Sequence, residues 1–222
     1  MAVKREKEPI TIKKIKKAHA ERKDEIRRRL AEFAEIGERG TDLNLWEEMV
    51  FCFFTGGCSA RMGLNALEAV KPIILTGDQA ELAAALSSVH RYPNARSRYI
   101  VASRNFLNEH CGLRLRSKLN GFDCALARRD WLVNEEGIKG LGYKEASHYL
   151  RNIGFKGYAI LDKHVLNCLA ELKIIDDPKP PNTRSKYLTI EDKLKKLTSK
   201  VGIDFDELDL VLWSIKTGKI LK

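Results

Sequence analysis

The fold is decided by the stretch Gly137-Ile-Lys-Gly-Leu-Gly-Tyr-Lys144 and by the segment Ile160-Leu-Asp-Lys-His-Val165, whose aspartate lies eighteen residues (162 − 144) after the lysine. Helical patterns flank the glycines on both sides, so the stretch predicts a helix, a tight turn and a second helix. Gly140 and Gly142 permit positive φ angles in the turn. Such a turn can present backbone N–H groups beside a helix N-terminus, where they bind an anionic oxygen.

The spacing of the glycines excludes two common nucleotide-binding loops. A Walker loop from Gly137 requires lysine at position 143, where Tyr143 stands. A dinucleotide fingerprint from Gly140 requires glycine at position 145, where Glu145 stands. The glycines therefore belong to a turn between helices.

The charge of the chain favours a polyanion as its partner. The sequence has 40 Lys and Arg against 30 Asp and Glu, and residues 1–29 hold twelve of the former and five of the latter. An arm that contacts nucleic acid and a solvated basic helix face both explain this excess. The turn of Lys139, Gly140 and Gly142 fits one backbone phosphate, a contact that positions DNA without reading its sequence. A helical hairpin that packs for stability alone is the alternative.

Helical periodicity and capping signals cover most of the chain. The predicted helices are 1–36, with residues 1–9 frayed and Gly37 as a stop, 45–55 with Asn44 as N-cap, 59–70, 78–89 with Asp78 as cap, one from residue 94, one over 124–132, one that includes 166–172, 185–201 and 206–217. No stretch alternates strictly enough to predict a sheet. The fold class is therefore all-α, with about ten helices.

Cysteine usage and the N-terminal sequence predict an intracellular protein. The five cysteines have no Cys-x-x-Cys pair, which argues against a metal cluster and a disulfide framework. No apolar run has the length of a signal peptide or a transmembrane helix. We therefore expect neither a membrane nor a metal.

Lys144 and Asp162 carry the candidate chemistry. A lysine in the first turn of a helix meets the positive end of the helix dipole, which disfavours the ammonium and leaves more free amine to act as a nucleophile. An ordinary surface lysine is the alternative for Lys144, and a simple N-cap is the alternative for Asp162. An amine and a carboxylate near a phosphate-binding turn would together suit attack on a sugar carbon.

These residues lie in a longer pattern that resembles a known superfamily. Lys139-Gly-Leu-Gly-Tyr-Lys144, with Ile-Leu-Asp-Lys-His-Val after it, is similar to the helix-hairpin-helix and Gly/Pro-Asp core of the DNA base-excision glycosylases (HhH-GPD). The string Gly-Tyr-Lys-Glu-Ala-Ser-His-Tyr-Leu-Arg-Asn-Ile-Gly and the ending Thr-Gly-Lys-Ile-Leu-Lys resemble the type 2 8-oxoguanine DNA glycosylase/lyases. The similarity extends more loosely from Trp46 to the C-terminus.

The resemblance implies an all-α fold of two helical lobes, with the active site in the cleft between them. Residues 1–222 would form one catalytic unit. Its parts would be the basic N-terminal helix 1–36, the helix-hairpin-helix 137–154, and the C-terminal helices 178–222, which contribute to base recognition.

The resemblance also implies the roles of individual residues. Lys144 would attack C1′ of the damaged nucleotide, expel the base and promote strand scission by β-elimination, and Asp162 would stabilise positive charge on the sugar and help to activate the amine. The base would leave the helical stack and enter a pocket. The residues that bind it would be Tyr92, Asp209, Trp213 and the terminal Lys222. Burial of Trp213 in the core and solvation of Asp209 are the alternatives for these two side chains.

Damaged double-stranded DNA that contains 8-oxoguanine would then be the partner of a monomeric enzyme. No cofactor is expected, and only Cys168 follows Asp162, so the four-cysteine iron–sulfur cluster of the endonuclease III-like branch is absent. The sequence gives no basis for deciding whether an ion binds the hairpin. An endonuclease III-like lyase for abasic sites or oxidised pyrimidines, and a non-enzymatic DNA-binding hairpin module, stay open as alternatives.

Overall fold

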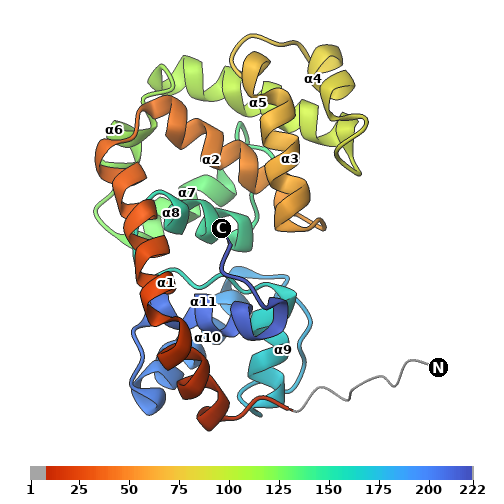
Figure 1. Ribbon diagram of the computed structural model, residues 1–222. Helices are drawn as coiled ribbons and strands as arrows, with labels where there is room; N and C mark the ends of the chain where they lie inside the picture. The colour runs from red at the N-terminus through yellow and green to blue at the C-terminus, as the bar shows by residue number, and fades with distance from the viewer. Residues whose placement is uncertain (1–8, 222) are drawn as a thin grey trace, which may run out of the picture. The chain divides into compact units, whose positions relative to one another are not determined.

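The protein is helical throughout the part that the structure describes. A computed structural model describes residues 9–221, so the predicted frayed segment lies almost wholly outside it (Figure 1). These residues form eleven α-helices and one short 3-10 helix, without a strand, which confirms the all-α prediction. The elements are α1 Ile12–Arg39, α2 Asp42–Thr55, α3 Ala60–Val70, η1 Lys71–Ile73, α4 Gln79–Leu86, α5 Pro93–Cys111, α6 Leu115–Asn120, α7 Ala125–Asn134, α8 Tyr143–Asn152, α9 Lys163–Glu171, α10 Arg184–Val201 and α11 Phe205–Thr217.

The chain divides into two compact units, which we describe separately. Unit 1 contains residues up to Arg28 and residues 161–220, and unit 2 contains residues 29–160 and Leu221. Helix α1 runs without interruption through the boundary between them. None of the helices in residues 9–221 combines the length and the apolar content needed to cross a membrane.

Helix α2 forms the centre of unit 2 and packs against α3, α5, α6 and α8. Its side chains from Leu45 to Thr55 are all buried, and Trp46, Phe51 and Phe54 are fully inaccessible to solvent. Each large apolar side chain buried in this way contributes about 1.5–3 kcal/mol to folding. The apolar run in the sequence is therefore a core helix, as predicted.

The N-cap of α2 differs from the prediction. The cap is Thr41, whose hydroxyl accepts a hydrogen bond from the amide of Asn44 at 3.2 Å. The Asn44 side chain accepts in return from the amide of Thr41 at 2.9 Å. Asn44 is thus at position N3 of the capping box and is not its N-cap, because a threonine three residues earlier completes the same reciprocal pair.

Gly37 does not end α1, which continues to Arg39. A Cβ atom at Gly37 would lie 2.3 Å from the carbonyl oxygen of Ile153, and a Cβ atom at Gly154 would lie 3.0 Å from Cα of Ala34. Gly37 therefore allows the helix backbone to pack directly against the loop after α8. The helix ends instead at Gly40, whose amide binds the carbonyl of Ile36.

The remaining helix boundaries follow the sequence with two exceptions. Ser59 caps α3 and Asp78 caps α4, as predicted. Helix α4 ends at Leu86, three residues before the predicted end. Helix α6 was not predicted, because its six residues are too few to show a helical repeat.

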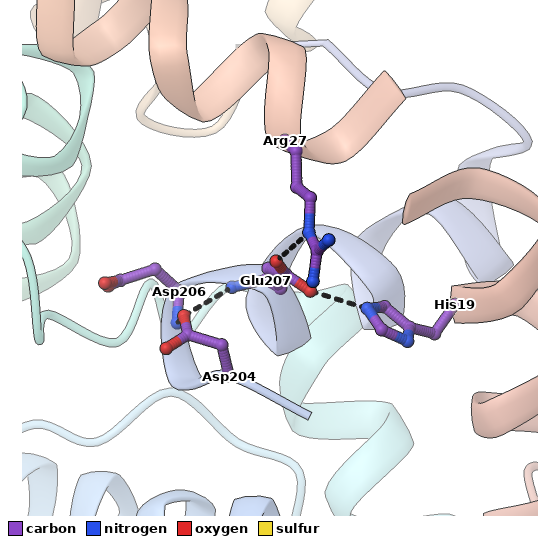
Figure 2. Close-up of polar contacts among 5 residues, drawn as sticks. All are labelled: His19, Arg27, Asp204, Asp206 and Glu207. Carbon is purple, nitrogen blue, oxygen red and sulfur yellow. Dashed lines mark hydrogen bonds and ion pairs between the residues drawn. The ribbon is translucent and has the colours of Figure 1, made fainter. Parts of the chain in front are cut away.

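Unit 1 contains an ion-pair network around the buried Glu207, in which Arg27 is largely exposed (Figure 2). Glu207 lies in the first turn of α11, where Oε1 accepts from Arg27 Nε at 2.7 Å and Oε2 binds His19 Nε2 at 2.6 Å. Asp204 caps the same helix by accepting from the amides of Asp206 and Glu207. Burial raises the pKa of Glu207, but the hydrogen bonds from Arg27 and His19 outweigh burial, so the net pKa is lowered. Glu207 therefore joins α1 to α11 as a carboxylate.

We expect Glu207→Gln to lower the free energy of unfolding at pH 7 by about 1–3 kcal/mol, because it removes a buried charge that two partners bind. A lowered folded-state pKa means that the carboxylate contributes stability above its unfolded pKa of about 4.3, and that this contribution is lost as pH falls through the lower folded-state value. The difference between the two proteins should therefore shrink below pH of about 4. Urea denaturation at several pH values measures it.

Glu21→Gln is the control for this prediction. Glu21 forms an exposed pair with Lys17 at 3.8 Å on the same helix. Its loss should change the free energy of unfolding by less than about 0.5 kcal/mol. Equal effects of the two substitutions would contradict the structural role of the Glu207 network.

Candidate functional site

A polar cluster surrounds Lys144 at the N-terminus of α8 in unit 2. Lys144 Nζ lies 3.4 Å from Oε1 of Glu145 and 3.5 Å from Oγ1 of Thr55, the last residue of α2. The side chains of Lys144 and Glu145 are 23% and 19% exposed. The amine is thus partly shielded from water but still accessible, as a reacting group must be. Lys144 is therefore not a fully exposed surface lysine, and its role stays a prediction.

The Thr55 hydroxyl can only accept a hydrogen bond from Lys144. Thr55 is buried, with 6% of its surface exposed, and its hydroxyl donates its one hydrogen to the carbonyl of Cys52 at 3.0 Å. The lone pairs of Oγ1 are then left for the amine. Each contact of Lys144 Nζ with Thr55 and Glu145 is therefore one in which the nitrogen is the donor.

The glycine turn lies against one face of α5. Gly140 has a φ of 83°, and a Cβ atom there would lie 2.4 Å from the ring of Tyr99. The amide of Lys139 donates to the buried hydroxyl of Ser103 at 2.9 Å, so this N–H does not face outward as the prediction required. Gly142 is exposed and begins α8 without a side-chain cap. The amide of Lys139 is therefore not available to an anion, whereas Gly142 at the start of α8 is exposed.

Tyr92 also lies in unit 2, at the start of α5. Its side chain is 40% exposed, and the guanidinium groups of Arg91 and Arg96 lie 5.3 Å and 5.7 Å from its ring centre. Arg96 also donates to the carbonyl of Gly56 at 2.5 Å, next to Thr55. Arg96 thus contacts both Tyr92, the predicted stacking residue, and the end of α2 that lies beside Lys144.

Asp162 is the N-cap of α9 in unit 1. Its Oδ1 accepts from the amides of His164 and Val165, both at 2.8 Å. The N-cap interpretation is therefore correct. Both amides bind the same oxygen, so the cap fixes the carboxylate without using Oδ2.

Two predicted base-recognition residues lie on α11, in the same unit as Asp162. Trp213 is partly buried and its ring meets that of His164 edge-on, with centres 6.3 Å apart. Asp209, one helical turn earlier, is buried with 6% exposure, which contradicts the solvated alternative. The first turn of α9 thus joins Asp162 to Trp213 through His164. Lys222 lies outside the described residues.

Four residues near these sites were not singled out in the sequence: Thr55, Arg96, Glu145 and His164. Thr55 ends an apolar helix, where a lone polar residue is a weak signal. Arg96 is one of many arginines. Glu145 directly follows Lys144, and His164 comes two residues after Asp162. This proximity in the sequence was the only signal that could have indicated them.

Burial keeps several thiols protonated. It raises the pKa of Cys168 to about 12 and raises that of Cys52 well above its usual value. Residues 9–221 contain no group of three or more His, Cys, Asp or Glu that could hold a metal ion. The expectation that the protein needs no cofactor stays a prediction.

We expect Gly140→Ala to lower the free energy of unfolding by about 2–4 kcal/mol, because alanine is strained at positive φ and its methyl group would overlap Tyr99. Gly142→Ala should cost less than about 1 kcal/mol, since its φ of −87° suits any residue and a Cβ atom would lie 3.4 Å from Glu145 Oε2. Urea denaturation compares the two. Similar losses would show that the turn is not packed as described.

Comparison with known proteins gives a consistent family of relatives. A family model described as 8-oxoguanine DNA glycosylase matches residues 26–203. The chain is 43% identical to the 8-oxoguanine DNA glycosylase/AP lyase of Korarchaeum cryptofilum, over 89% of this chain and 90% of that protein. It is 36% identical to the protein of the same name from Methanocaldococcus jannaschii, over 95% and 99% of the two chains.

Solved structures agree with the sequence relatives. The 8-oxoguanine glycosylase/lyase of Methanocaldococcus jannaschii, in complex with a 15mer DNA containing 8-oxoguanine, has a TM-score of 0.86 and 35% identity, over 95% of this chain and 99% of that one. The 8-oxoguanine DNA glycosylase of Thermotoga maritima also has a TM-score of 0.86, with 34% identity over 95% and 98%. The similarity thus includes both units.

Proposed function

The chain belongs to the 8-oxoguanine DNA glycosylase family, and from this premise we propose that it is a base-excision repair enzyme that removes 8-oxoguanine from DNA and cleaves the strand as an AP lyase. The single observation that supports this best is the partly buried lysine of the hairpin, held between a hydroxyl and a carboxylate at the start of α8. A surface lysine that only binds DNA would not need such an environment. The same observation disfavours a non-enzymatic hairpin module.

Lys144 is the nucleophile in this proposal. Its neutral amine attacks C1′ of the damaged nucleotide, the bond from C1′ to the base breaks, and the base leaves with the bonding electrons and a proton. The covalent product opens to a Schiff base between Lys144 and C1′. Loss of the C2′ proton then breaks the C3′–O bond to the phosphate, which cleaves the strand by β-elimination. The geometry of Lys144 supports the first step, because the amine is accessible and its position is restrained.

Asp162 stabilises the positive charge that develops on the sugar as the base leaves. Its N-cap bonds hold the carboxylate in one orientation, since both backbone amides donate to the same oxygen. Such fixed charge costs no reorganisation when the reaction occurs. The same carboxylate thus caps α9 and serves the reaction.

The hairpin and the basic charge bind the DNA backbone. Gly142 and the uncapped start of α8 offer donors and a helix dipole to one phosphate, and the exposed Lys139 adds a positive charge. Gly140 supports this contact by letting the turn lie against α5. These contacts hold the duplex without selecting its sequence.

Selection of the damaged base falls to other residues. 8-Oxoguanine carries a hydrogen at N7, where guanine has an acceptor, so a site that recognises it must present an acceptor there. Tyr92 and Trp213 offer partly exposed aromatic faces for stacking, and the buried Asp209 offers a carboxylate. The terminal Lys222 supplies a free carboxylate in this proposal.

We expect Lys144→Gln to abolish the covalent protein–DNA adduct that borohydride traps on a duplex with 8-oxoguanine, because only a lysine Schiff base can be reduced to a stable amine. DNA affinity should change by no more than a few-fold, since the phosphate-binding turn is retained. Gel electrophoresis measures the adduct and fluorescence anisotropy the affinity.

Lys156→Gln is the matched control, because Lys156 is an exposed lysine of the same unit. It should trap as well as the unchanged protein. Persistent trapping by Lys144→Gln would place the nucleophile elsewhere. Faster trapping on a duplex with an oxidised pyrimidine than on one with 8-oxoguanine would favour the endonuclease III-like alternative.

Asp162→Asn should lower the rate of base excision by at least about 100-fold while leaving stability within about 1 kcal/mol, because asparagine is an equally good N-cap but carries no charge. Single-turnover excision and urea denaturation measure the two effects. Asp162→Ala, which loses the cap as well, should be the less stable of the two variants. A normal excision rate in Asp162→Asn would leave Asp162 with its N-cap role alone.

A further inference from the structure

We propose that Thr55 is a positioning residue, which aims the amine of Lys144 through a hydrogen bond that persists when the amine loses its proton. The inference rests on the proposed function and adds a residue on another helix to the hairpin and the aspartate. It depends on the contacts of Thr55 with Cys52, Gly63 and Lys144, all of them within unit 2.

One hydrogen bond and the position of its methyl group beside α3 restrict the side chain of Thr55. Its hydroxyl donates to the carbonyl of Cys52 at 3.0 Å. Its methyl group points towards α3, where a Cβ atom at Gly63 would lie 3.5 Å from it. A β-branched side chain whose hydroxyl is bound, and whose methyl group faces a neighbouring helix, keeps one rotamer. The direction of the hydroxyl lone pairs is therefore fixed before the lysine meets them.

The backbone around Thr55 is also held in place. The next residue, Gly56, accepts a hydrogen bond through its carbonyl from Arg96 Nη2 at 2.5 Å. Arg96 belongs to α5, so the end of α2 is bound to a neighbouring helix at the point where it contacts Lys144. A misplacement of about 1 Å in a reacting group can cost about 100-fold in rate, which gives such fixing a purpose.

Thr55 and Glu145 act differently on Lys144. The carboxylate of Glu145 attracts the ammonium, and its attraction weakens when the nitrogen becomes neutral. The hydroxyl of Thr55 is a neutral acceptor, which binds an N–H of the ammonium and an N–H of the free amine alike. The contact with Thr55 therefore changes less than the contact with Glu145 when the nucleophilic form appears, in which the remaining lone pair must face C1′.

The test compares Thr55→Val with Thr55→Ser. Valine keeps the methyl group and loses the acceptor, whereas serine keeps the acceptor and loses the methyl group. The rate of borohydride-trapped adduct formation is measured under single-turnover conditions on the 8-oxoguanine duplex, at saturating protein. Affinity for the same duplex and the midpoint of urea denaturation are measured for each variant.

We expect Thr55→Val to form the adduct at about a tenth of the unchanged rate. Its DNA affinity should stay within about threefold of that of the unchanged protein. Thr55→Ser should react within about threefold of the unchanged rate, although its denaturation midpoint is lowered by the lost contact with α3. The serine variant thus separates the positioning of the amine from the stability of the fold. If Thr55 had a purely structural role, Thr55→Ser would react as slowly as Thr55→Val or more slowly.

An unchanged rate in Thr55→Val overturns the inference, as does a rate that follows the denaturation midpoint across both variants. These outcomes leave the proposed function intact, provided that the unchanged protein forms the adduct. No adduct from the unchanged protein on the 8-oxoguanine duplex overturns the proposed function and the inference with it.

Discussion

The place of Lys144 depends on a close approach between the glycine turn and α5. Tyr99, Ser103 and Phe106 lie at positions four and three residues apart, so they share one face of that helix. The turn meets this face with glycines where the rings are closest and with an amide hydrogen bond where the serine stands. No side chain fits between them. The start of α8, and with it Lys144, is therefore fixed by a backbone that only glycine allows.

Much of the fold was predictable because its signals are local. Capping boxes, apolar periodicity and the absence of alternation depend on neighbours in the sequence, and they located nearly every helix. The errors at Gly37 and Asn44 have another cause. Gly37 is required by Ile153, far along the chain, and Asn44 is equally plausible in two positions of a capping box. A local pattern cannot distinguish a glycine that ends a helix from one that admits a neighbouring backbone.

The candidate site could be predicted from the sequence to a similar extent. The motif around Lys144 and the eighteen-residue step to Asp162 can be read directly from the sequence, so both residues could be proposed as candidates without the structure. The partners of Lys144 were harder to identify, since Thr55 lies 89 residues away and looks like an ordinary helix end. The N-cap role of Asp162 and its proposed chemical role turned out to be compatible, because the amides bind one carboxylate oxygen and fix its direction. A structural explanation for a residue therefore does not remove a chemical one.

The contact between Gly37 and the loop after α8 couples the packing at the C-terminal end of α8 to the position of its N-terminal end. Helix α8 has ten residues and is about 15 Å long. Lys144 lies near its N-terminal end, and the loop that packs against Gly37 of α1 follows its C-terminal end. A side chain at Gly37 or Gly154 would tilt it, and a tilt of about 5° moves the far end by about 1 Å. A mutational scan scored on activity will thus mark both glycines together with the proposed reacting residues, although both glycines lie at the opposite end of α8 from Lys144.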